Sequence, residues 1–345
     1  MKVSIIIAVE EVNDFVRENI SHCLAMNFID FEILLFVSHE TDESFAKTRI
    51  VVRSDLAFNP AQRRDLAIGE ASGSILAFID DDAYPSPNWL THAVSYFEDP
   101  TIAAVGGPGI TPPRDNLRQQ VSGWSSASPL GGGPSAAYRF IPGRKREVDD
   151  YPSMNLIIRK SDFLMVGGFD SNYWPGEDTK LCSDLTLKIG KRIIYDPEVL
   201  VYHHRRPIFK DHLKQNGRYG FHRGHFARVL PQTSRKLVYF LPSIFAVFII
   251  FGPLLSFLLL FIPAKGWSAS GGNYQFSIIN FTNVLKAYFL LLISYLLLLF
   301  LNSFWVHQRC KNYKIAFLTI PTVFLTHIWY GIQFIFGLST KKIKF

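Results

Sequence analysis

Residues 75–82 read "ILAFIDDD", five apolar residues followed by three aspartates. The apolar run has the length and composition of a strand that is buried on both faces. Three adjacent carboxylates repel one another, so a cation is expected near Asp80, Asp81 and Asp82. One aspartate alone could cap a following helix, but a cap needs only one. Since open α/β sheets bind ligands at the carboxyl ends of their strands, this stretch predicts a charged ligand site at the end of a central strand.

The segments on the amino-terminal side alternate between strand and helix patterns. "VSIIIAV" (3–9) and "FEILLFV" (31–37) are apolar runs typical of buried parallel strands. Residues 13–26 and 61–71 have apolar side chains at helical spacing, and Asn13 or Asp14 is available as a cap. The order strand, helix, strand, helix, strand predicts an α/β domain with a mostly parallel central sheet.

The segments on the carboxyl-terminal side are less regular. Residues 106–152 are rich in Gly, Pro and Ser, which predicts long surface loops. Such loops are either a lid over the ligand site or a disordered insertion, and the sequence favours neither alternative. Residues 153–169 return to a strand and then a helix, and residues 188–206 contain two more short strands.

Charge and cysteine content exclude several classes of protein. The net charge of the 345-residue chain is +7, and basic residues collect at 203–236. No Lys/Arg-rich helix with interleaved aromatics marks a nucleic-acid surface, so this placement favours membrane and phosphate groups. Cys23, Cys182 and Cys310 are far apart and form no CxxC pair, which argues against a disulfide framework or a zinc site.

The last third of the chain has the composition of membrane helices. Residues 237–262 and 287–306 carry no charge and exceed the ~18 residues expected of a span. A third stretch, 315–338, is apolar but contains polar residues. The predicted organisation is an α/β domain at 1–232 and a membrane region at 233–345.

Basic residues around these stretches predict the orientation. They flank the first two spans and would be cytoplasmic under the positive-inside rule: Arg235, Lys236, Arg309, Lys311 and Lys314. A third span would place the lysines at 341–344 outside, against the rule. The third stretch therefore either spans with an exceptional tail or lies partly in the interface, and we predict three spans. The protein is expected in the cell membrane as a multi-pass protein, with the domain at 1–232 on the cytoplasmic side.

A second acidic motif lies in "GGFDSNYWPGEDTKLC" (167–182). Glu177 and Asp178 follow aromatic residues and a turn and precede a helix. Acidic residues at a helix start are ordinary caps and dipole partners. Together with the aspartate triplet, however, the pair predicts a shared catalytic site.

Four stretches in this order carry a family resemblance. They are "VSIIIAV" (3–9), "AQRRDLAIGEASGSILAFIDDDA" (61–83), "GGFDSNYWPGEDTKLC" (167–182) and "PEVLVYHHRR" (197–206). Over about residues 3–230 the chain resembles a family 2 glycosyltransferase of the GT-A fold with a membrane-anchored carboxyl terminus. The resemblance identifies the second stretch with the metal-binding DxD motif and the third with the segment that ends in the catalytic base.

The resemblance implies a role for each of these residues. Mg²⁺ or Mn²⁺ would be held by Asp80, Asp82 and His203, because hard cations prefer oxygen ligands and stabilise a departing diphosphate. Asp178 would be the base that accepts the proton of the attacking hydroxyl, and Glu177 would orient substrate. The donor-binding residues would be Ala8, Glu10, Ser38, Arg64, Asp80 and Asp81.

The chain departs from the family pattern at the ends of its first two strands. The first strand ends "AVEE", and Val37 and Ser38 stand where family members carry acidic residues that hold the base. The nucleotide is therefore open between uracil, guanine and thymine. Asp65 stands where relatives often have Asn.

The predicted function is a membrane-bound, metal-dependent inverting glycosyltransferase. Its expected partners are a nucleotide-sugar donor, a lipid-linked or cell-surface glycan acceptor and membrane lipids, with no nucleic acid. A polyprenyl-phosphate sugar synthase is the alternative within the class, and a catalytically inactive membrane scaffold is the alternative outside it. The stretch "KQNGRYGFHRGHFAR" (214–228) is only loosely similar to the QxxRW motif of processive polymerases, which favours a single transfer.

Overall fold

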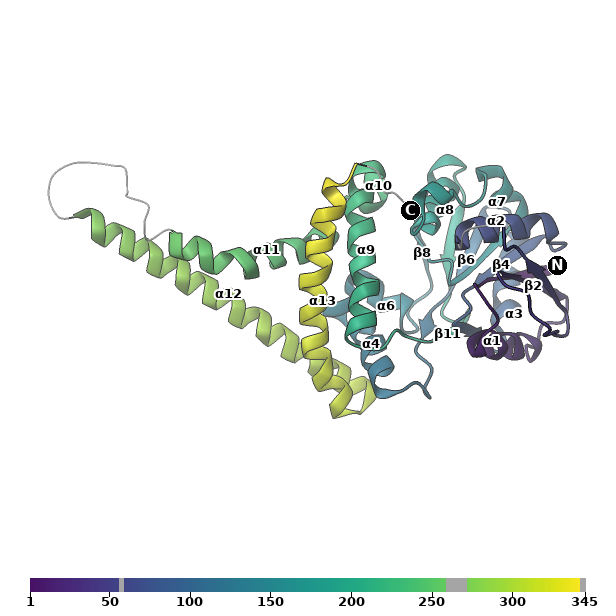
Figure 1. Cartoon of the computed structure of the whole chain (residues 1–345), viewed down its shortest axis with the longest axis horizontal. Helices are drawn as coiled ribbons and strands as arrows, with labels where there is room; N and C mark the ends of the chain where they lie inside the picture. Colours follow the sequence, from purple (N-terminus) through teal and green to yellow (C-terminus); the bar gives the residue numbers. More distant parts are fainter. Residues whose placement is uncertain (56–58, 259–271, 342–345) are drawn as a thin grey trace. The chain divides into compact units, whose positions relative to one another are not determined.

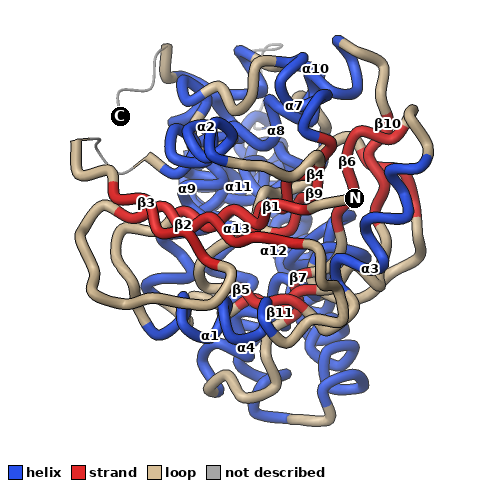
Figure 2. The backbone as a smooth tube through the Cα atoms, turned by 90° about the vertical axis from the view of Figure 1, so that its right-hand side faces the viewer, coloured by secondary structure: helices blue, strands red, loops and turns tan. Residues whose placement is uncertain are grey.

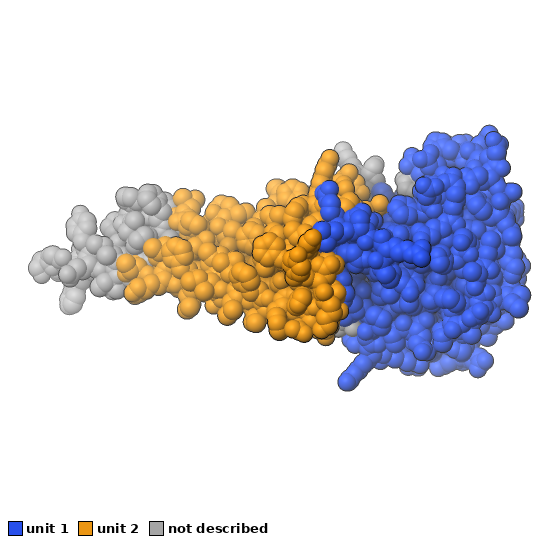
Figure 3. All heavy atoms as spheres, turned by 90° about the horizontal axis from the view of Figure 1, so that it is seen from below, with its two compact units in different colours: residues 1–127, 134–205 blue, residues 128–133, 206–345 orange. Residues whose placement is uncertain are grey.

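The computed structural model describes residues 1–55, 59–258 and 272–341 (Figure 1). The chain divides into two compact units, which Figure 3 draws in blue and orange. Unit 1 consists of Met1–Ala127 and Pro134–Arg205, and unit 2 consists of Ser128–Gly133 and Arg206–Phe345. The short segment 128–133 therefore belongs to unit 2, although in the sequence it lies between two stretches of unit 1.

Unit 1 is built on an eight-stranded sheet, drawn in red in Figure 2. The strand order is β3 (Thr48–Val52), β2 (Phe31–Val37), β1 (Val3–Ala8), β4 (Ile75–Ile79), β9 (Asn155–Arg159), β6 (Ile102–Gly106), β10 (Arg192–Tyr195) and β8 (Arg146–Val148). The first four strands are parallel, and β6 and β10 are parallel to each other. Strand β9 is antiparallel to its two neighbours, and β8 is antiparallel to β10. The predicted α/β fold with a mostly parallel sheet is confirmed.

Helices cover both faces of this sheet and bury an apolar core on each. They are α1 (Asp14–Leu24), α2 (Pro60–Glu70), α3 (Trp89–Val94), α7 (Lys160–Val166) and α8 (Glu177–Ser183). Ile5 and Ile7 of β1 point into one core, whereas Ile6 points into the other. Each such fully buried side chain contributes about 1.5–3 kcal/mol, which is why the central strands read as unbroken apolar runs.

Helix caps place the starts of α1 and α2. Asn13 rather than Asp14 is the cap of α1, because its side-chain oxygen accepts a hydrogen bond from Val16 N at 3.0 Å. Asn59 caps α2 through Ala61 N at 3.0 Å. These caps satisfy amide groups that have no partner within the helix.

A second, three-stranded sheet brings distant residues together. Its order is β5 (Ala83–Pro85), β11 (Val201–His203) and β7 (Gly109–Ile110). Strand β11 is antiparallel to β5 and pairs His203 with Ala83. This register places His203 next to the residue that directly follows the aspartate triplet.

The segment 106–152, expected to consist of loops, contains helices. They are α4 (Leu117–Ala127), α5 (Pro129–Gly132) and α6 (Ala136–Arg139). Helix α4 buries small residues, and a Cβ on Gly123 would lie 1.9 Å from Thr111 Oγ1. Small residues make close packing possible here, but in the sequence they have the composition of a loop. Shorter turns of helix are η1 (Ser95–Glu98), η2 (Gly133–Ser135), η3 (Ser171–Tyr173) and η4 (Asp184–Lys188).

Unit 2 consists of helices. These are α9 (Lys210–Val229), α10 (Pro231–Ser234), α11 (Leu237–Leu258), α12 (Gly272–Cys310) and α13 (Tyr313–Ser339), together with α5. Three candidate membrane spans, by length and composition, are Leu237–Leu254, Thr282–Cys310 and Tyr313–Ser339. They indicate a membrane-associated protein. The end of the first predicted span at 259–262, the residues 263–271 that follow it, and Lys342 and Lys344 lie outside the described residues.

Helices α9 and α13 pack with their backbones close together (Figure 1). A Cβ on Gly224 of α9 would lie 2.0 Å from Phe334 O, and a Cβ on Gly337 of α13 would lie 1.8 Å from Phe221 O. Because α9 packs on α13 in this way, the division between the units falls at Arg205 and Arg206. This division lies upstream of the domain boundary expected at 232.

Side chains of α12 and α13 hold the segment 128–133. Asn302 Oδ1 accepts a hydrogen bond from Leu130 N at 3.0 Å. His327 Nε2 donates to Leu130 O at 3.0 Å, and its Nδ1 accepts from Tyr295 Oη at 2.8 Å. Polar residues within the candidate spans thus form hydrogen bonds with the amide and the carbonyl of Leu130.

Candidate active site

Two aspartates and one histidine form a cluster with metal-ligand chemistry. One ligand atom from each of Asp80, Asp82 and His203 lies within 4.8 Å of the others. Asp82 is buried, and its Oδ1 lies 3.1 Å from His203 Nε2. Carboxylate oxygens with an imidazole nitrogen suit a divalent cation such as Mn²⁺ or Mg²⁺. The residues predicted as metal ligands are therefore brought together, and their role stays a prediction.

The contacts of His203 determine which of its two ring nitrogens carries the proton. Arg205 Nη1 donates to His203 Nδ1 at 3.0 Å, because a guanidinium has no acceptor. The proton of the neutral ring therefore lies on Nε2, which faces Asp82. His203 could bind a cation through Nε2 only after the contact with Arg205 is released, whereas Asp80 and Asp82 need no such change of tautomer.

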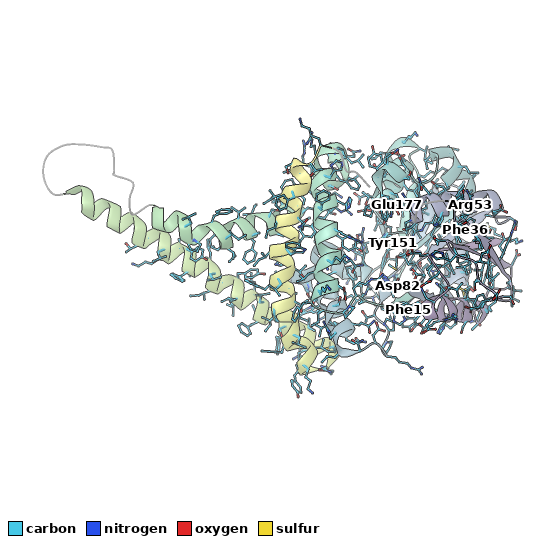
Figure 4. The ribbon with its side chains drawn as sticks, viewed as in Figure 1. Phe15, Phe36, Arg53, Asp82, Tyr151 and Glu177 are labelled. Carbon is cyan, nitrogen blue, oxygen red and sulfur yellow. The ribbon has the colours of Figure 1, made fainter. Side chains whose placement is uncertain are left out.

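Arg64 connects this cluster to the second acidic motif. Its Nη2 donates to Asp80 Oδ1 at 2.7 Å, and its Nη1 donates to Glu177 Oε1 at 3.1 Å. The side chains of Arg64 and Glu177 are buried, being 8% and 6% exposed. Figure 4 shows Asp82 and Glu177 on the same side of unit 1, with Arg53 on the opposite side. The two motifs, far apart in sequence, thus share one guanidinium and form one site.

Replacing Arg64 by glutamine should destabilise the protein. Glu177 would lose its cation while remaining buried, which costs about 3 kcal/mol of the free energy of unfolding. The matched control is Arg53→Gln, because Arg53 pairs with Asp55 at the surface. Chemical denaturation should show a large loss for Arg64→Gln and none for the control. The double variant Arg64→Gln/Glu177→Gln should recover part of the loss, and the absence of any recovery would contradict the assignment.

Glu177 and Asp178 are held differently at the start of α8. Glu177 Oε2 accepts from Gly176 N at 2.8 Å, and its other oxygen is bound to Arg64. Asp178 Oδ1 accepts from Thr179 N at 2.7 Å, and Oδ2 lies 3.4 Å from Ser153 N. Asp178 is also the more exposed of the two. It is therefore the carboxylate of the pair that is better placed to accept a proton.

Asp65 is a carboxylate with an altered proton affinity beside this site. Burial raises the pKa of Asp65 to about 7, and the negative charge of Glu177 adds to the rise. Its Oδ1 accepts from Phe169 N at 2.8 Å. A Cβ on Gly168, whose φ is +77°, would lie 2.7 Å from the same oxygen. Asp65 therefore holds the turn that leads to Glu177 and Asp178.

The variant Asp65→Asn should change how stability depends on pH. In the wild type the folded state binds this proton more tightly than the unfolded state. The resulting stability is fully present below about pH 4 and is lost as pH rises towards 7. The variant should therefore be about 2 kcal/mol more stable than the wild type at pH 8. This value is smaller than the full pKa shift would give, because Asp65 is partly exposed to solvent. Chemical denaturation of both proteins measures this, and a difference in stability that is the same at pH 5 and pH 8 would contradict it.

The predicted donor-binding residues other than Arg64 lie at the carboxyl ends of β1, β2 and β4. Ser38 N donates to Glu10 O at 2.8 Å, just beyond Ala8. Ser38 Oγ is buried and has no hydrogen-bond partner among the described residues. Asp81 follows β4, and Asn13 Nδ2 is 3.5 Å from its Oδ2. These positions group at one edge of the sheet, and nucleotide recognition by them stays a prediction.

Several residues that support the site were not predicted. Arg63 is fully buried, and its Nη1 donates to Val37 O at 3.1 Å. Asn19 Nδ2 donates to Asp80 O at 2.9 Å, which fixes the backbone of the triplet. The helical position of Asn19, on the buried side of α1, is the only sequence signal for its role.

Two carboxylates bind the ring nitrogens of His204. Its Nδ1 lies 2.5 Å from Asp115 Oδ1, and its Nε2 lies 2.8 Å from Glu18 Oε2. Burial alone would lower the pKa of His204, but the hydrogen bonds to Asp115 and Glu18 outweigh burial and raise it. His204 therefore joins α1, β11 and the loop that contains Asp115, and is not free to contact a phosphate.

Comparisons with known proteins give one family and several similar relatives. Residues 4–162 match the model of the family described as "Glycosyl transferase family 2". A pre-mycofactocin glycosyltransferase of Mycobacterium tuberculosis is 30% identical over 182 residues, which cover 52% of this chain and 37% of the relative. A glucosyl-dolichyl phosphate glucuronosyltransferase of Haloferax volcanii is 24% identical over 229 residues, 59% of this chain and 69% of the relative. The chain thus spans little more than a third of the mycobacterial relative.

A solved structure shares the fold over most of the chain. The mannosyltransferase PcManGT of Pyrobaculum calidifontis, in complex with GDP-Man and Mn²⁺, is 17% identical with a TM-score of 0.50. The likeness covers 93% of this chain and 86% of that chain. At this identity the comparison shows the fold alone, and it supports a GT-A architecture for unit 1.

Proposed function

We propose that this chain, whose residues 4–162 match the model of glycosyl transferase family 2, moves a sugar from a nucleotide-sugar donor to an acceptor at the membrane. The transfer would be metal-dependent and would invert the anomeric centre. The observation that carries the proposal is the contact of Arg64 with both Asp80 and Glu177. It joins a cluster suited to a cation to a pair of carboxylates suited to proton transfer.

The chemistry divides between the two motifs. A divalent cation held by Asp80 and Asp82 would neutralise the charge that develops on the nucleoside diphosphate. Asp178 would accept the proton of the acceptor hydroxyl as its oxygen attacks the anomeric carbon and the bond to the diphosphate breaks. A carboxylate with an ordinary pKa is ionised at pH 7, so a general base of this type needs no activation. Glu177, bound to Arg64, would keep the loop before Asp178 in position.

The acceptor is proposed to be lipid-linked or a growing surface glycan. Apolar helices at the carboxyl-terminal end of the chain would keep the active site near a bilayer. The name of the Haloferax volcanii relative describes transfer to a glucosyl-dolichyl phosphate, a lipid-linked sugar. Basic residues beside the first two candidate spans would hold the catalytic unit on the cytoplasmic side.

A thermal-shift screen of nucleotide sugars tests the proposal. Purified full-length protein would be heated with UDP-, GDP- and dTDP-sugars in the presence of Mn²⁺, Mg²⁺ or EDTA. One nucleotide class should raise the apparent Tm with metal and not with EDTA, because only the folded protein binds it. No shift with any donor would overturn the proposal. Hydrolysis of the matching donor by the wild type, absent in Asp178→Asn, would separate an enzyme from an inactive scaffold.

A polyprenyl-phosphate sugar synthase is the second candidate. It shares with the name of the Haloferax volcanii relative a dolichyl phosphate carrier, which in that name already bears a glucose. If polyprenyl phosphate alone accepts labelled sugar into the organic phase, this candidate replaces transfer to a glycan. If a lipid-linked saccharide is required, the leading proposal stands.

A further inference from the structure

A cavity lies within unit 2, between α9 and α13. Its volume is about 440 Å³. Leu213, Phe221 and Trp329 supply apolar surface, and Gln333 supplies an amide. The three charged residues in the lining are all cationic: Lys210, Lys214 and Arg218. The cavity therefore combines apolar walls with positive charge.

The three cations follow one face of α9. Their spacing is four residues, so they are neighbours on the helix surface, and like charges at this spacing repel. All three side chains are exposed. No ion pair or side-chain hydrogen bond joins them to any described residue. An anion bound between them would relieve the repulsion, and a phosphate group suits both lysine and arginine.

The charged residues of α9 would be costly in the hydrocarbon core of a bilayer, so α9 does not lie there. The helix carries five cations and one carboxylate, and charged groups are expensive at the centre of a membrane. Yet α9 packs closely on the carboxyl-terminal half of α13, where His212 Nε2 lies 3.0 Å from Thr326 Oγ1. That half of α13 must therefore share the depth of α9. Both belong at the level of the lipid headgroups.

The other long helices of unit 2 run in a different direction. Helices α11 and α12 lie side by side and run across the direction of α9 and α13 (Figure 1). If α11 and α12 cross the bilayer, α9 and α13 lie along its surface. Two spans would also leave Lys341 on the cytoplasmic side, as the positive-inside rule requires. Trp329 would then lie in the interface, where tryptophan is enriched.

We propose that α9 and α13 lie along the membrane surface and that the cavity between them binds the phosphate headgroup of an anionic lipid. Lys210, Lys214 and Arg218 would contact the phosphate, while Leu213, Phe221 and Trp329 would contact the upper part of the acyl chains. The site is independent of sugar transfer, because all its residues belong to unit 2. It would hold the helix pair at the bilayer whatever the donor and acceptor are.

The test compares two double variants of the full-length protein in detergent micelles. K214Q/R218Q removes two cations of the cavity. R228Q/K314Q is the matched control, because it removes one arginine and one lysine from α9 and α13 outside the cavity lining. Each protein would be titrated with dioctanoyl-phosphatidylglycerol, dioctanoyl-phosphatidylcholine or inorganic phosphate. The apparent Tm gives the affinity, and the Tm without lipid verifies that each variant folds.

The expected result is binding of phosphatidylglycerol by the wild type and the control, weakened about 10- to 30-fold in K214Q/R218Q. Equal affinities in the two double variants would overturn the proposal. If phosphatidylcholine binds as tightly as phosphatidylglycerol, the cavity recognises the acyl chains and not the negative charge of the headgroup. Equal binding of inorganic phosphate would assign the site to a free anion. Either of these two outcomes also contradicts an anionic-lipid site.

Discussion

Asp178→Asn should abolish sugar transfer while leaving donor binding intact. Asparagine has nearly the same shape but cannot accept a proton, so kcat should fall by about 10³-fold, within the range of general-base catalysis. The donor Kd should stay within a few-fold of the wild type, because Asp178 lies outside the cluster of Asp80, Asp82 and His203. Single-turnover transfer and titration with the donor measure the two quantities separately.

The structure provides a control and an alternative for this experiment. Asp30 precedes β2 at the opposite end of the strand from Ser38, so Asp30→Asn makes the same change in charge away from the site. In Asp178→Asn the amide oxygen can still accept from Thr179 N, and the amide group would disturb the long contact from Ser153 N. If Asp178→Asn retains most activity and Glu177→Gln loses it, Glu177 is the base and the assignment made here is wrong.

Asp82→Asn should separate metal-dependent binding from folding. The amide side chain can still accept a hydrogen bond from His203 Nε2, which lies 3.1 Å from Asp82 Oδ1 in the wild type. It has lost the negative charge that attracts a divalent cation. We expect Mn²⁺ affinity, and with it donor affinity in Mn²⁺, to fall about 100-fold, at the upper end of the losses known for residues that support a metal.

Free Mn²⁺ measured by electron paramagnetic resonance gives this affinity without any enzymatic assay. Asp82→Ala should lose at least as much affinity and should also lose stability, because the hydrogen bond from His203 to this carboxylate disappears. Asp30→Asn should bind like the wild type. Unchanged Mn²⁺ stoichiometry and affinity in Asp82→Asn would remove the metal site from these residues.

The sequence predicted the elements of unit 1 wherever the pattern is local. Apolar runs identified β1, β2 and β4 because these strands are buried on both faces. Strand β3 was not predicted, because it lies at the edge of the sheet and mixes partly buried and exposed residues. Helix α4 was hidden by the small residues that allow it to pack. The acidic motifs could be found because adjacent carboxylates repel one another, which indicates a bound cation or another function.

The contacts between distant segments could not be read from the sequence. Arg64 was expected near the nucleotide, but its bridge to Glu177 spans 113 residues and depends on how α2 and α8 are placed on the sheet. His204 lies in the basic segment 203–236, but nothing local in the sequence indicates that Asp115 and Glu18 bind it. Residues 214–228 were compared with a polymerase motif. Their glycines instead permit close packing of α9 on α13, which no local pattern indicates.

The six residues from Ser128 to Gly133 decide how a soluble fragment of this protein can be made. Cutting the chain after Arg205 would retain them but discard Asn302 and His327, which bind the amide and carbonyl of Leu130. The turn that contains Leu130 would then lose the helices on which it packs, so the Leu130 side chain would face water and such a fragment should be more prone to aggregate during expression. Replacing residues 128–133 by a short polar linker in the same fragment is the remedy, because it removes the turn without touching either stretch of unit 1.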